Sequence, residues 1–396
     1  MDRVGDFKSE LIRWRRHLHQ YPELSFQEVE TAKFVANILN DMPGMKVEIG
    51  VGYPTSVIGT ISSGNGPTIA IRADMDALPI QEENRCSYRS QVKDVMHACG
   101  HDAHTTIALG AAHILSMLFR SEELQGTVKF FFQPAEEHVD ENGLSGAGYM
   151  VRAGVLDQVD AVIALHMDPE NKVGEVKIHD GYSMANVDVF QAKIRASGGH
   201  GAYPYLGTDS IWMLSHVLPV IYGITGRLVS PLEPAVISIG KIHAGVTNNV
   251  IPSEVEIHGT IRSYDPTVRK LLMKEMEKAF SLVNSLDGMY ELSFIEEDPA
   301  LFNHPEINRV FKQVIGDLFP HYQIINQPFG LGGEDFAHMT QKVPGAMFFL
   351  GCAVGDETIR NLHTPNFDID ENVLEVGTSI FVETVQRLLK VHPRKE

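Results

Sequence analysis

Side chains able to bind a metal ion stand at the carboxyl ends of three apolar runs in this chain. The runs are TIAIRADMDALP from Thr68, TVKFFF at 127–132 and DAVIALH at 160–166, and their β-branched and aromatic content is typical of buried strands. Asp74 and Asp76 close the first run, Glu136 and Glu137 follow the second, and His166 ends the third. In open α/β sheets, ligands bind beyond the carboxyl ends of the strands. We therefore expect an α/β fold in which these side chains converge at one edge of a sheet.

The segment VKDVMHACGHDAH at 92–104 holds the densest group of such side chains. These are Cys99 and His101, two apart on a glycine-containing turn, with His97, Asp102 and His104 close by. A thiolate, an imidazole and nearby carboxylates suit a borderline-soft divalent ion such as zinc. Because a helix is expected to start here, Asp102 and His104 also have a plainer interpretation as its N-terminal acid and cap. Together with the strand-end residues and His363 in RNLHTPNF, the segment predicts a metal centre.

Several short motifs follow one another along nearly the whole chain. They are QYPELSFQE at 20–28, RADMDALP at 72–79, HACGHDAHT at 97–105, FQPAEE at 132–137, ALH at 164–166, GGHGAYP at 198–204, TNNVIP at 247–252, GTIRS at 259–263, GGEDF at 332–336 and LHTPNFDID at 362–370. With them the chain resembles the M20 metallopeptidase and amidohydrolase family. Within that family it is most similar to the branch of aminoacylases, hippurate hydrolases and indole-acetyl-amino-acid hydrolases.

This resemblance implies a site for two divalent metal ions. Its ligands would be Cys99, His101, Glu137, His166 and His363. Glu136 would be the general base, and Asp76 would orient a ligand without binding the metal itself. Spacing alone leaves open which of the two adjacent glutamates binds metal and which acts as the base. Zinc or manganese is the expected cofactor, although cobalt and nickel also suit these ligands.

The reaction implied by the resemblance is hydrolysis of the amide bond of an N-acyl amino acid, which releases a carboxylic acid and a free amino acid. Two divalent ions share a water, lower its pKa and polarise the substrate carbonyl. Glu136 would take a proton from that water and deliver it to the leaving amine.

Three residues nearer the middle of the chain complete the implied site. His200 would stabilise the developing oxyanion, in its own or a partner's subunit, but it also reads as a turn histidine in a glycine-rich loop. Asn248 and Arg262 would hold the substrate carboxylate, since a guanidinium pairs with a carboxylate at two points. The plainer interpretation of Arg262 is an arginine on a surface strand.

The order of the motifs predicts a discontinuous catalytic domain, because His363 lies far beyond the other candidate ligands. We expect residues 1–186 and 300–396 to form this domain, with a central mixed sheet flanked by helices. Between them, strand-like segments at 187–197, 235–245 and 254–264 alternate with helical stretches at 208–225 and 266–285. This order predicts an inserted α+β domain of ferredoxin type at 187–299. By family resemblance it would be a lid and dimerisation domain, which makes the expected assembly a homodimer or a higher homo-oligomer.

Charge and composition exclude several partners. The formal net charge of −18 argues against nucleic acid, which needs a basic surface. No window approaches 18 uninterrupted apolar residues, so no membrane span is expected, and the N-terminal stretch lacks the apolar region of a signal peptide. Three cysteines, Cys86, Cys99 and Cys352, give no disulfide framework and favour a reducing cytoplasm.

Three rival functions stay open from the sequence. A dipeptidase or aminopeptidase would use the same scaffold on a substrate with a free amino group. A thiol mechanism would make Cys99 the nucleophile, with His101 or His97 as its base. A metal-binding protein without activity is the third, and the retained pair Glu136 and Glu137 counts against it.

Overall fold

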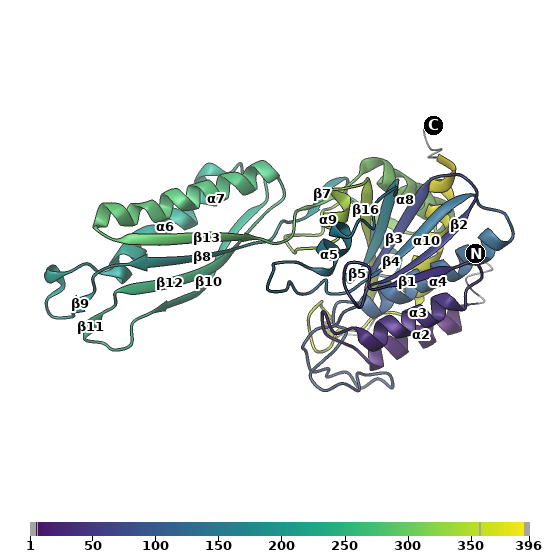
Figure 1. Ribbon diagram of the computed structural model, residues 1–396, viewed down its shortest axis with the longest axis horizontal. Coiled ribbons are helices and arrows are strands. Elements are labelled where there is room, and N and C mark those ends of the chain that lie inside the picture. Colours follow the sequence, from purple (N-terminus) through teal and green to yellow (C-terminus); the bar gives the residue numbers. More distant parts are fainter. Residues whose placement is uncertain (1–4, 6, 356–357, 392–396) are drawn as a thin grey trace. The chain divides into compact units, whose positions relative to one another are not determined.

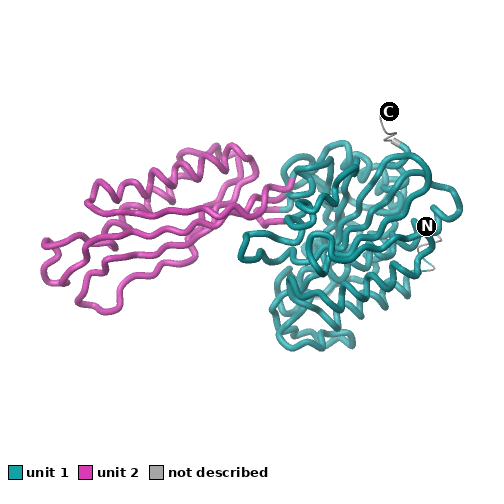
Figure 2. Tube along the Cα trace, in the orientation of Figure 1, with its two compact units in different colours: residues 1–183, 302–329, 335–396 teal, residues 184–301, 330–334 magenta. Residues whose placement is uncertain are grey.

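The computed structural model describes residues 5, 7–355 and 358–391, and the chain divides into two compact units (Figures 1 and 2). Unit 1 comprises Met1–Ser183, Phe302–Phe329 and Asp335–Glu396, and unit 2 comprises Met184–Leu301 and Gly330–Glu334. Two short strands, β7 (Gly181–Met184) and β14 (Leu301–Asn303), pair where the chain passes from one unit to the other. None of the described helices is long and apolar enough to cross a membrane.

Unit 1 is built on an eight-stranded mixed sheet. In spatial order its strands are β1 (Lys46–Ile49), β2 (Val57–Ser63), β4 (Gly126–Gln133), β3 (Thr68–Asp74), β5 (Ala161–Lys172), β16 (Gly345–Ala353), β6 (Glu175–Lys177) and β15 (Gln323–Ile325). The central strands β4, β3, β5 and β16 run parallel, whereas β1, β2 and β6 add antiparallel pairs. The three apolar runs of the sequence form β3, β4 and β5. The expected α/β fold with a central mixed sheet is therefore confirmed.

The helices of unit 1 cover this sheet and bury its apolar side chains. They are α2 (Lys8–Gln20), α3 (Val29–Asn40), α4 (His101–Arg120), α5 (Gly146–Arg152), α8 (Pro305–Leu318), α9 (Ala337–Thr340) and α10 (Asn372–Val391). α4 and α10 pack on each other and on β3, where Ile69 and Ile71 are fully buried in the main core (Figure 1). Because side chains alternate across a strand, Arg72 points to the opposite face, where it reaches Asp335.

Unit 2 is a four-stranded antiparallel sheet covered by two helices. Its main elements are β8 (Asp188–Arg195), α6 (Ser210–Leu228), β10 (Ala235–Ala244), β12 (Glu254–Ser263), α7 (Pro266–Ser281) and β13 (Met289–Glu296). The sheet order is β10-β12-β8-β13, so the chain follows the β-α-β-β-α-β path of the ferredoxin-like motif. Buried and half-buried residues alternate along β12, as expected of a sheet with one face against helices (Figure 1). The short strands β9 (Gly199–His200) and β11 (Val250–Ile251) and the 3-10 turns Pro204–Leu206 and Leu282–Leu286 complete it.

A buried ionic network in unit 1 joins the N-terminal helix to distant parts of the chain. The Arg15 side chain on α2 is fully buried, and it donates to Asp102 at 2.9 Å and to Asp368 at 2.9 Å. His19, one helical turn later, lies 2.8 Å from the same Asp102 oxygen. Burial opposes the charge on Asp102, but Arg15 and His19 outweigh it and hold the pKa of this carboxyl far below its usual range. The network thus fixes α2, the start of α4 and the segment near residue 368 to one another.

We predict that Asp102→Ala lowers the free energy of unfolding by about 3–5 kcal/mol at neutral pH, because it leaves the buried Arg15 short of a partner. Because the pKa of Asp102 is depressed in the folded state, its stabilisation is present above the ordinary carboxyl pKa of about 4 and fades as the pH falls below that value. Guanidinium denaturation across this pH range measures both effects.

Arg13→Ala is the matched control, because Arg13 lies on the same helix and pairs with Glu10 at the exposed surface. Its removal should cost less than about 1 kcal/mol. A loss of equal size in both variants would contradict the role given to the buried network.

Candidate metal centre

The turn that carries Cys99 and His101 depends on the glycine between them. Gly100 has a φ of +95°, and a Cβ added there would lie 2.8 Å from the Met167 side chain. Only glycine adopts this conformation without strain, and it leaves room for the close approach. The helix α4 begins directly at His101, so the second of these residues stands on the first helical turn and not on an extended loop.

Candidate ligands from four separate segments gather beside this turn. They form three overlapping groups of three residues, and within each group the potential ligand atoms lie within 4.8 Å of one another. The groups are Cys99, His101 and His166; Cys99, Glu137 and His363; and His101, Glu136 and Glu137. The Cys99 sulfur lies 3.5 Å from Nε2 of His166, and Nε2 of His363 lies 3.3 Å from Oε1 of Glu137. The structure therefore brings all five ligands named by the family resemblance into one cluster within unit 1, with Glu136 beside them.

Two buried atoms in this cluster have no hydrogen-bond partner, and they face each other. Nε2 of His101 and Oε1 of Glu137 are 3.8 Å apart, and neither makes a well-aligned hydrogen bond, although His363 approaches the glutamate oxygen to 3.3 Å. On the other side of the ring, Nδ1 of His101 donates toward the Asp76 carbonyl at 2.9 Å and its carboxylate at 3.1 Å. This arrangement fixes Nδ1 as a donor and directs Nε2 at the carboxylates, where a metal ion would take the place of the Nε2 proton. A divalent metal ion with nitrogen, sulfur and oxygen ligands fits both unpaired atoms.

The charge of the cluster also fits a cation. Burial opposes protonation of His101, yet Asp74, Asp76 and Glu137 together raise its pKa to about 10. Burial raises the pKa of the Cys99 thiol well above its usual value, and Glu137 and Glu136 raise it further. A nucleophilic cysteine requires an electropositive setting that favours the thiolate. The acidic surroundings of Cys99 therefore disfavour a thiolate nucleophile, whereas a bound cation would offset these charges and stabilise the thiolate as its ligand.

Asp76 connects the two loops that carry most of the ligands. One carboxylate oxygen contacts His101, and the other accepts from the backbone N–H of Glu137 at 3.0 Å and from the Ser25 hydroxyl at 2.6 Å. A carboxylate in this position fixes both the ring orientation and the glutamate turn.

Two further residues at the site, Asp74 and His104, have contacts that the sequence pattern does not reveal. Nδ1 of His104 donates to Asp74 at 2.7 Å, and its Nε2 accepts from the backbone N–H of Met167 at 2.9 Å. Burial lowers the pKa of His104, in agreement with a neutral ring that accepts at Nε2. Asp102 does lie in the first turn of α4 and accepts from the Ala103 N–H at 2.9 Å, but it and His104 are also buried and make contacts with other elements. Only contacts that arise on folding reveal these roles.

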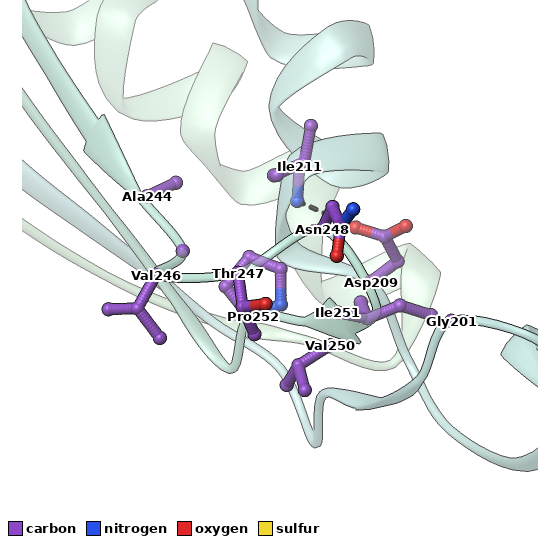
Figure 3. Close-up of a pocket in the computed structure, with 11 residues that line it drawn as sticks. Gly201, Asp209, Ile211, Ala244, Val246, Thr247, Asn248, Val250, Ile251 and Pro252 are labelled. Carbon is purple, nitrogen blue, oxygen red and sulfur yellow. Dashed lines mark hydrogen bonds between the residues drawn. The ribbon is translucent and has the colours of Figure 1, made fainter.

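The other three candidate residues belong to unit 2. His200 is exposed on β9, where its ring accepts from the backbone N–H of Ala202. Asn248 lines a hollow of about 500 Å³ between the start of α6 and the loop before β11 (Figure 3). Arg262 is half-buried on β12 and donates to the Leu331 carbonyl at 3.0 Å. The roles of these three residues stay predictions.

Together, the fold and the cluster of unit 1 define a metal-dependent hydrolase. The chain belongs to peptidase family M20/M25/M40, since residues 70–387 match that family. The family resemblance drawn from the motifs is thereby confirmed.

Relatives support the same placement. The chain is 39% identical to thermostable carboxypeptidase 1 of Saccharolobus solfataricus over 94% of both chains, and 37% identical to an N-acetyl-L-cysteine deacetylase of Bacillus subtilis over 98% of this chain and 90% of the relative. Among solved structures, an aminohydrolase from Staphylococcus aureus superposes with a TM-score of 0.91 at 33% identity, over 98% of both chains. A dinuclear metal-binding M20 peptidase of Bacillus subtilis superposes with a TM-score of 0.84 at 34% identity, over 98% of this chain and 99% of its own.

We predict that Cys99→Ser weakens zinc binding by at least about tenfold, because a serine hydroxyl stays protonated where a thiolate would bind the ion. Competition with a chelator at neutral pH measures the affinity. Cys86→Ser is the matched control, since Cys86 is a free, half-buried cysteine outside the cluster. Wild-type affinity in Cys99→Ser together with lost activity would favour the thiol mechanism instead.

Proposed function

We propose that this protein hydrolyses the amide bond of N-acyl amino acids with two divalent metal ions. The observation that carries the proposal is the presence of two adjacent glutamates at the cluster. Oε1 of Glu137 lies 3.8 Å from His101 and 3.3 Å from His363, and Oε2 of Glu136 lies 3.9 Å from the same His101 nitrogen. One carboxylate can therefore bind metal while its neighbour handles protons. The names of the deacetylase relative and of an Arabidopsis thaliana IAA-amino acid hydrolase, 36% identical over 97% of this chain and 87% of the relative, support an acylated substrate.

In this mechanism the two ions would be held by five ligands, which are Cys99, His101, Glu137, His166 and His363. When bound, the ions supply Lewis-acid polarisation of the carbonyl and a water of lowered pKa. Glu136 takes a proton from the attacking water while the oxygen of that water bonds to the carbonyl carbon. When the C–N bond breaks, Glu136 passes this proton to the leaving amine, a role usually worth about 10²–10⁴-fold in rate. Asp76 keeps the proton of His101 on Nδ1 throughout.

The substrate contacts in this proposal come from unit 2. Asn248 and Arg262 would bind the carboxylate of the amino acid, and His200 would donate to the developing oxyanion. Arg262 suits this task because its planar guanidinium can pair with a carboxylate at two points. We also propose that the protein works in a reducing cytoplasm, because its three cysteines are free.

A second candidate function is cleavage of a peptide bond next to a free carboxyl terminus. It is favoured by the relative named a carboxypeptidase, which is 39% identical over 94% of this chain. Both reactions break an amide bond beside an amino acid with a free carboxylate. They differ in whether the other side of that bond is an acyl group or an amino acid.

The decisive experiment measures amine release from N-acetyl and N-benzoyl amino acids beside plain dipeptides. We expect cleavage of the acylated substrates, loss of activity after treatment with a chelator, and recovery with zinc or manganese. Cleavage of dipeptides alone would establish the peptidase, and activity that resists the chelator would contradict the metal mechanism.

Glu136→Gln is the variant that tests the base within this experiment. It should bind metal as the wild type does and lose nearly all turnover, by about 10²-fold or more, because the carboxamide accepts no proton. Substantial activity in Glu136→Gln would contradict the assignment of the base.

We further propose that unit 2 pairs with unit 2 of a second copy. Exposed apolar side chains on α6 include Ile211, Trp212, Val220 and Tyr222, with exposed fractions of 49%, 51%, 43% and 58%. β10 adds Ile242 on an edge strand whose free backbone groups can pair with another chain. Large apolar side chains left exposed in such numbers on one helix are a common feature of protein interfaces.

We predict that Trp212→Glu shifts the protein to a monomer in analytical ultracentrifugation, since a charge would be buried in the interface. Met117→Glu is the matched control, because Met117 is similarly exposed, at 48%, on α4 of unit 1. A wild-type protein that sediments as a monomer, or an equal effect in both variants, would contradict pairing through unit 2.

A further inference from the structure

The motif QYPELSFQE at 20–28 has no part in the proposed chemistry, yet it lies against the site. It forms the connection between α2 and α3 in unit 1. The backbone N–H of Ala77, next to Asp76, donates to the Glu23 carbonyl at 2.8 Å, and the Ser25 hydroxyl donates to Asp76 itself. This connection therefore contacts the same strand end that orients His101.

Glu28, the last residue of the motif, is fully buried and holds two backbone amides with one oxygen. Its Oε1 accepts from the N–H of Phe26 at 2.8 Å and from the N–H of Ala135 at 2.9 Å. Its Oε2 accepts from the Thr55 hydroxyl at 2.8 Å. The carboxyl group thus joins the N-terminal connection to the turn before the two glutamates.

Both amides held by Glu28 belong to residues in an unfavourable backbone conformation. Phe26 has a φ of +66° and Ala135 a φ of +47°, in the left-handed region that side chains other than glycine rarely adopt. Such conformations persist only where surrounding contacts impose them, and they cluster at functional sites. On its other side, the Ala135 carbonyl accepts from the N–H of Gly146 at 2.8 Å. The Ala135 residue is therefore held at both its N–H and its C=O.

Ala135 directly precedes Glu136, so the backbone angles of Ala135 determine the direction in which the Glu136 side chain leaves the backbone. Asp76 independently holds the next N–H, that of Glu137. The two carboxyl groups, Glu28 and Asp76, therefore fix the turn on either side of Glu136. We propose that Glu28 is a positioning residue, which holds Ala135 in its left-handed conformation and thereby aims the Glu136 carboxylate. This proposal rests on the proposed role of Glu136 as the base.

This role depends on the length of the Glu28 side chain and not on its charge. Burial, with a further contribution from Asp76, raises the pKa of Glu28 to about 7. A carboxamide of the same length can accept both N–H groups through its oxygen and donate to the Thr55 hydroxyl through its nitrogen. An aspartate keeps the charge but is one methylene shorter, and it cannot hold both amides in the same positions.

The test compares Glu28→Gln with Glu28→Asp in the metal-loaded enzyme, on whichever amide the wild type cleaves. Glu28→Gln should keep a kcat close to that of the wild type. Glu28→Asp should lose about 100-fold in kcat with KM and bound metal unchanged, because a misplacement of about 1 Å in a catalytic group costs this much. A crystal structure of Glu28→Asp should show Ala135 outside the left-handed region.

Thr55→Val is the matched control, because it removes the bond to the other oxygen of Glu28 and leaves both amides held. It should keep the wild-type kcat. The proposal is overturned if Glu28→Asp keeps the wild-type kcat or loses its metal. It is also overturned if the kcat of Glu28→Gln or of Thr55→Val falls as far as that of Glu28→Asp. A wild type that cleaves none of the amides would defeat the proposed function alone, since the conformation of Ala135 in Glu28→Asp still tests the role of Glu28.

Discussion

Parallel strand pairing is the constraint on which the site of unit 1 depends. β3 pairs in parallel with both β4 and β5, and β5 pairs in parallel with β16, so their carboxyl ends lie along one edge of the sheet. In this register Asp74 lies opposite Gln133, and the loops that follow carry Asp76 and the two glutamates. A parallel sheet needs helices on its faces. α4, one of these helices, begins at His101 and brings a ligand to the same edge.

Such a concentration of carboxylates is stable only because buried cations oppose it. Arg72 is almost fully buried, and it contacts Asp74 at 2.6 Å and Asp335 at 2.6 Å. Arg15 plays the same part for Asp102, immediately after the metal-ligand candidate His101. A buried charge without a partner costs several kcal/mol. The two arginines therefore allow acidic groups to collect around the cluster, while the unpaired atoms of His101 and Glu137 stay directed at the place of the metal.

The sequence predicted the parts of this arrangement that local patterns encode. The apolar runs predicted β3, β4 and β5, and the density of polar residues near Cys99 predicted the cluster. His363 was a candidate from its own motif, but its assignment as a ligand came from family resemblance, because its loop is far away in the chain and has an unusual backbone, with a φ of +60°. The contacts of His104 and Asp102 with other elements were not predicted, since a helix-start pattern looks the same whether its acid serves the helix alone or also pairs with a buried arginine. β13 was not among the expected strands, although Tyr290, Leu292 and Phe294 alternate with polar residues and pack against the core of unit 2.

The loop of His363 has a consequence for how the protein is made. The backbone N–H of His363 donates to the Ala98 carbonyl at 2.8 Å, which ties this late loop to the turn carrying Cys99. Asp368, which neutralises Arg15, lies a few residues further on. During synthesis the other candidate ligands leave the ribosome before unit 2 is made, and His363 leaves only after it. A product of interrupted translation that ends before this loop lacks both a ligand and the partner of a buried arginine. The metal cluster and the buried network are therefore completed together, only when the last part of the chain has been made.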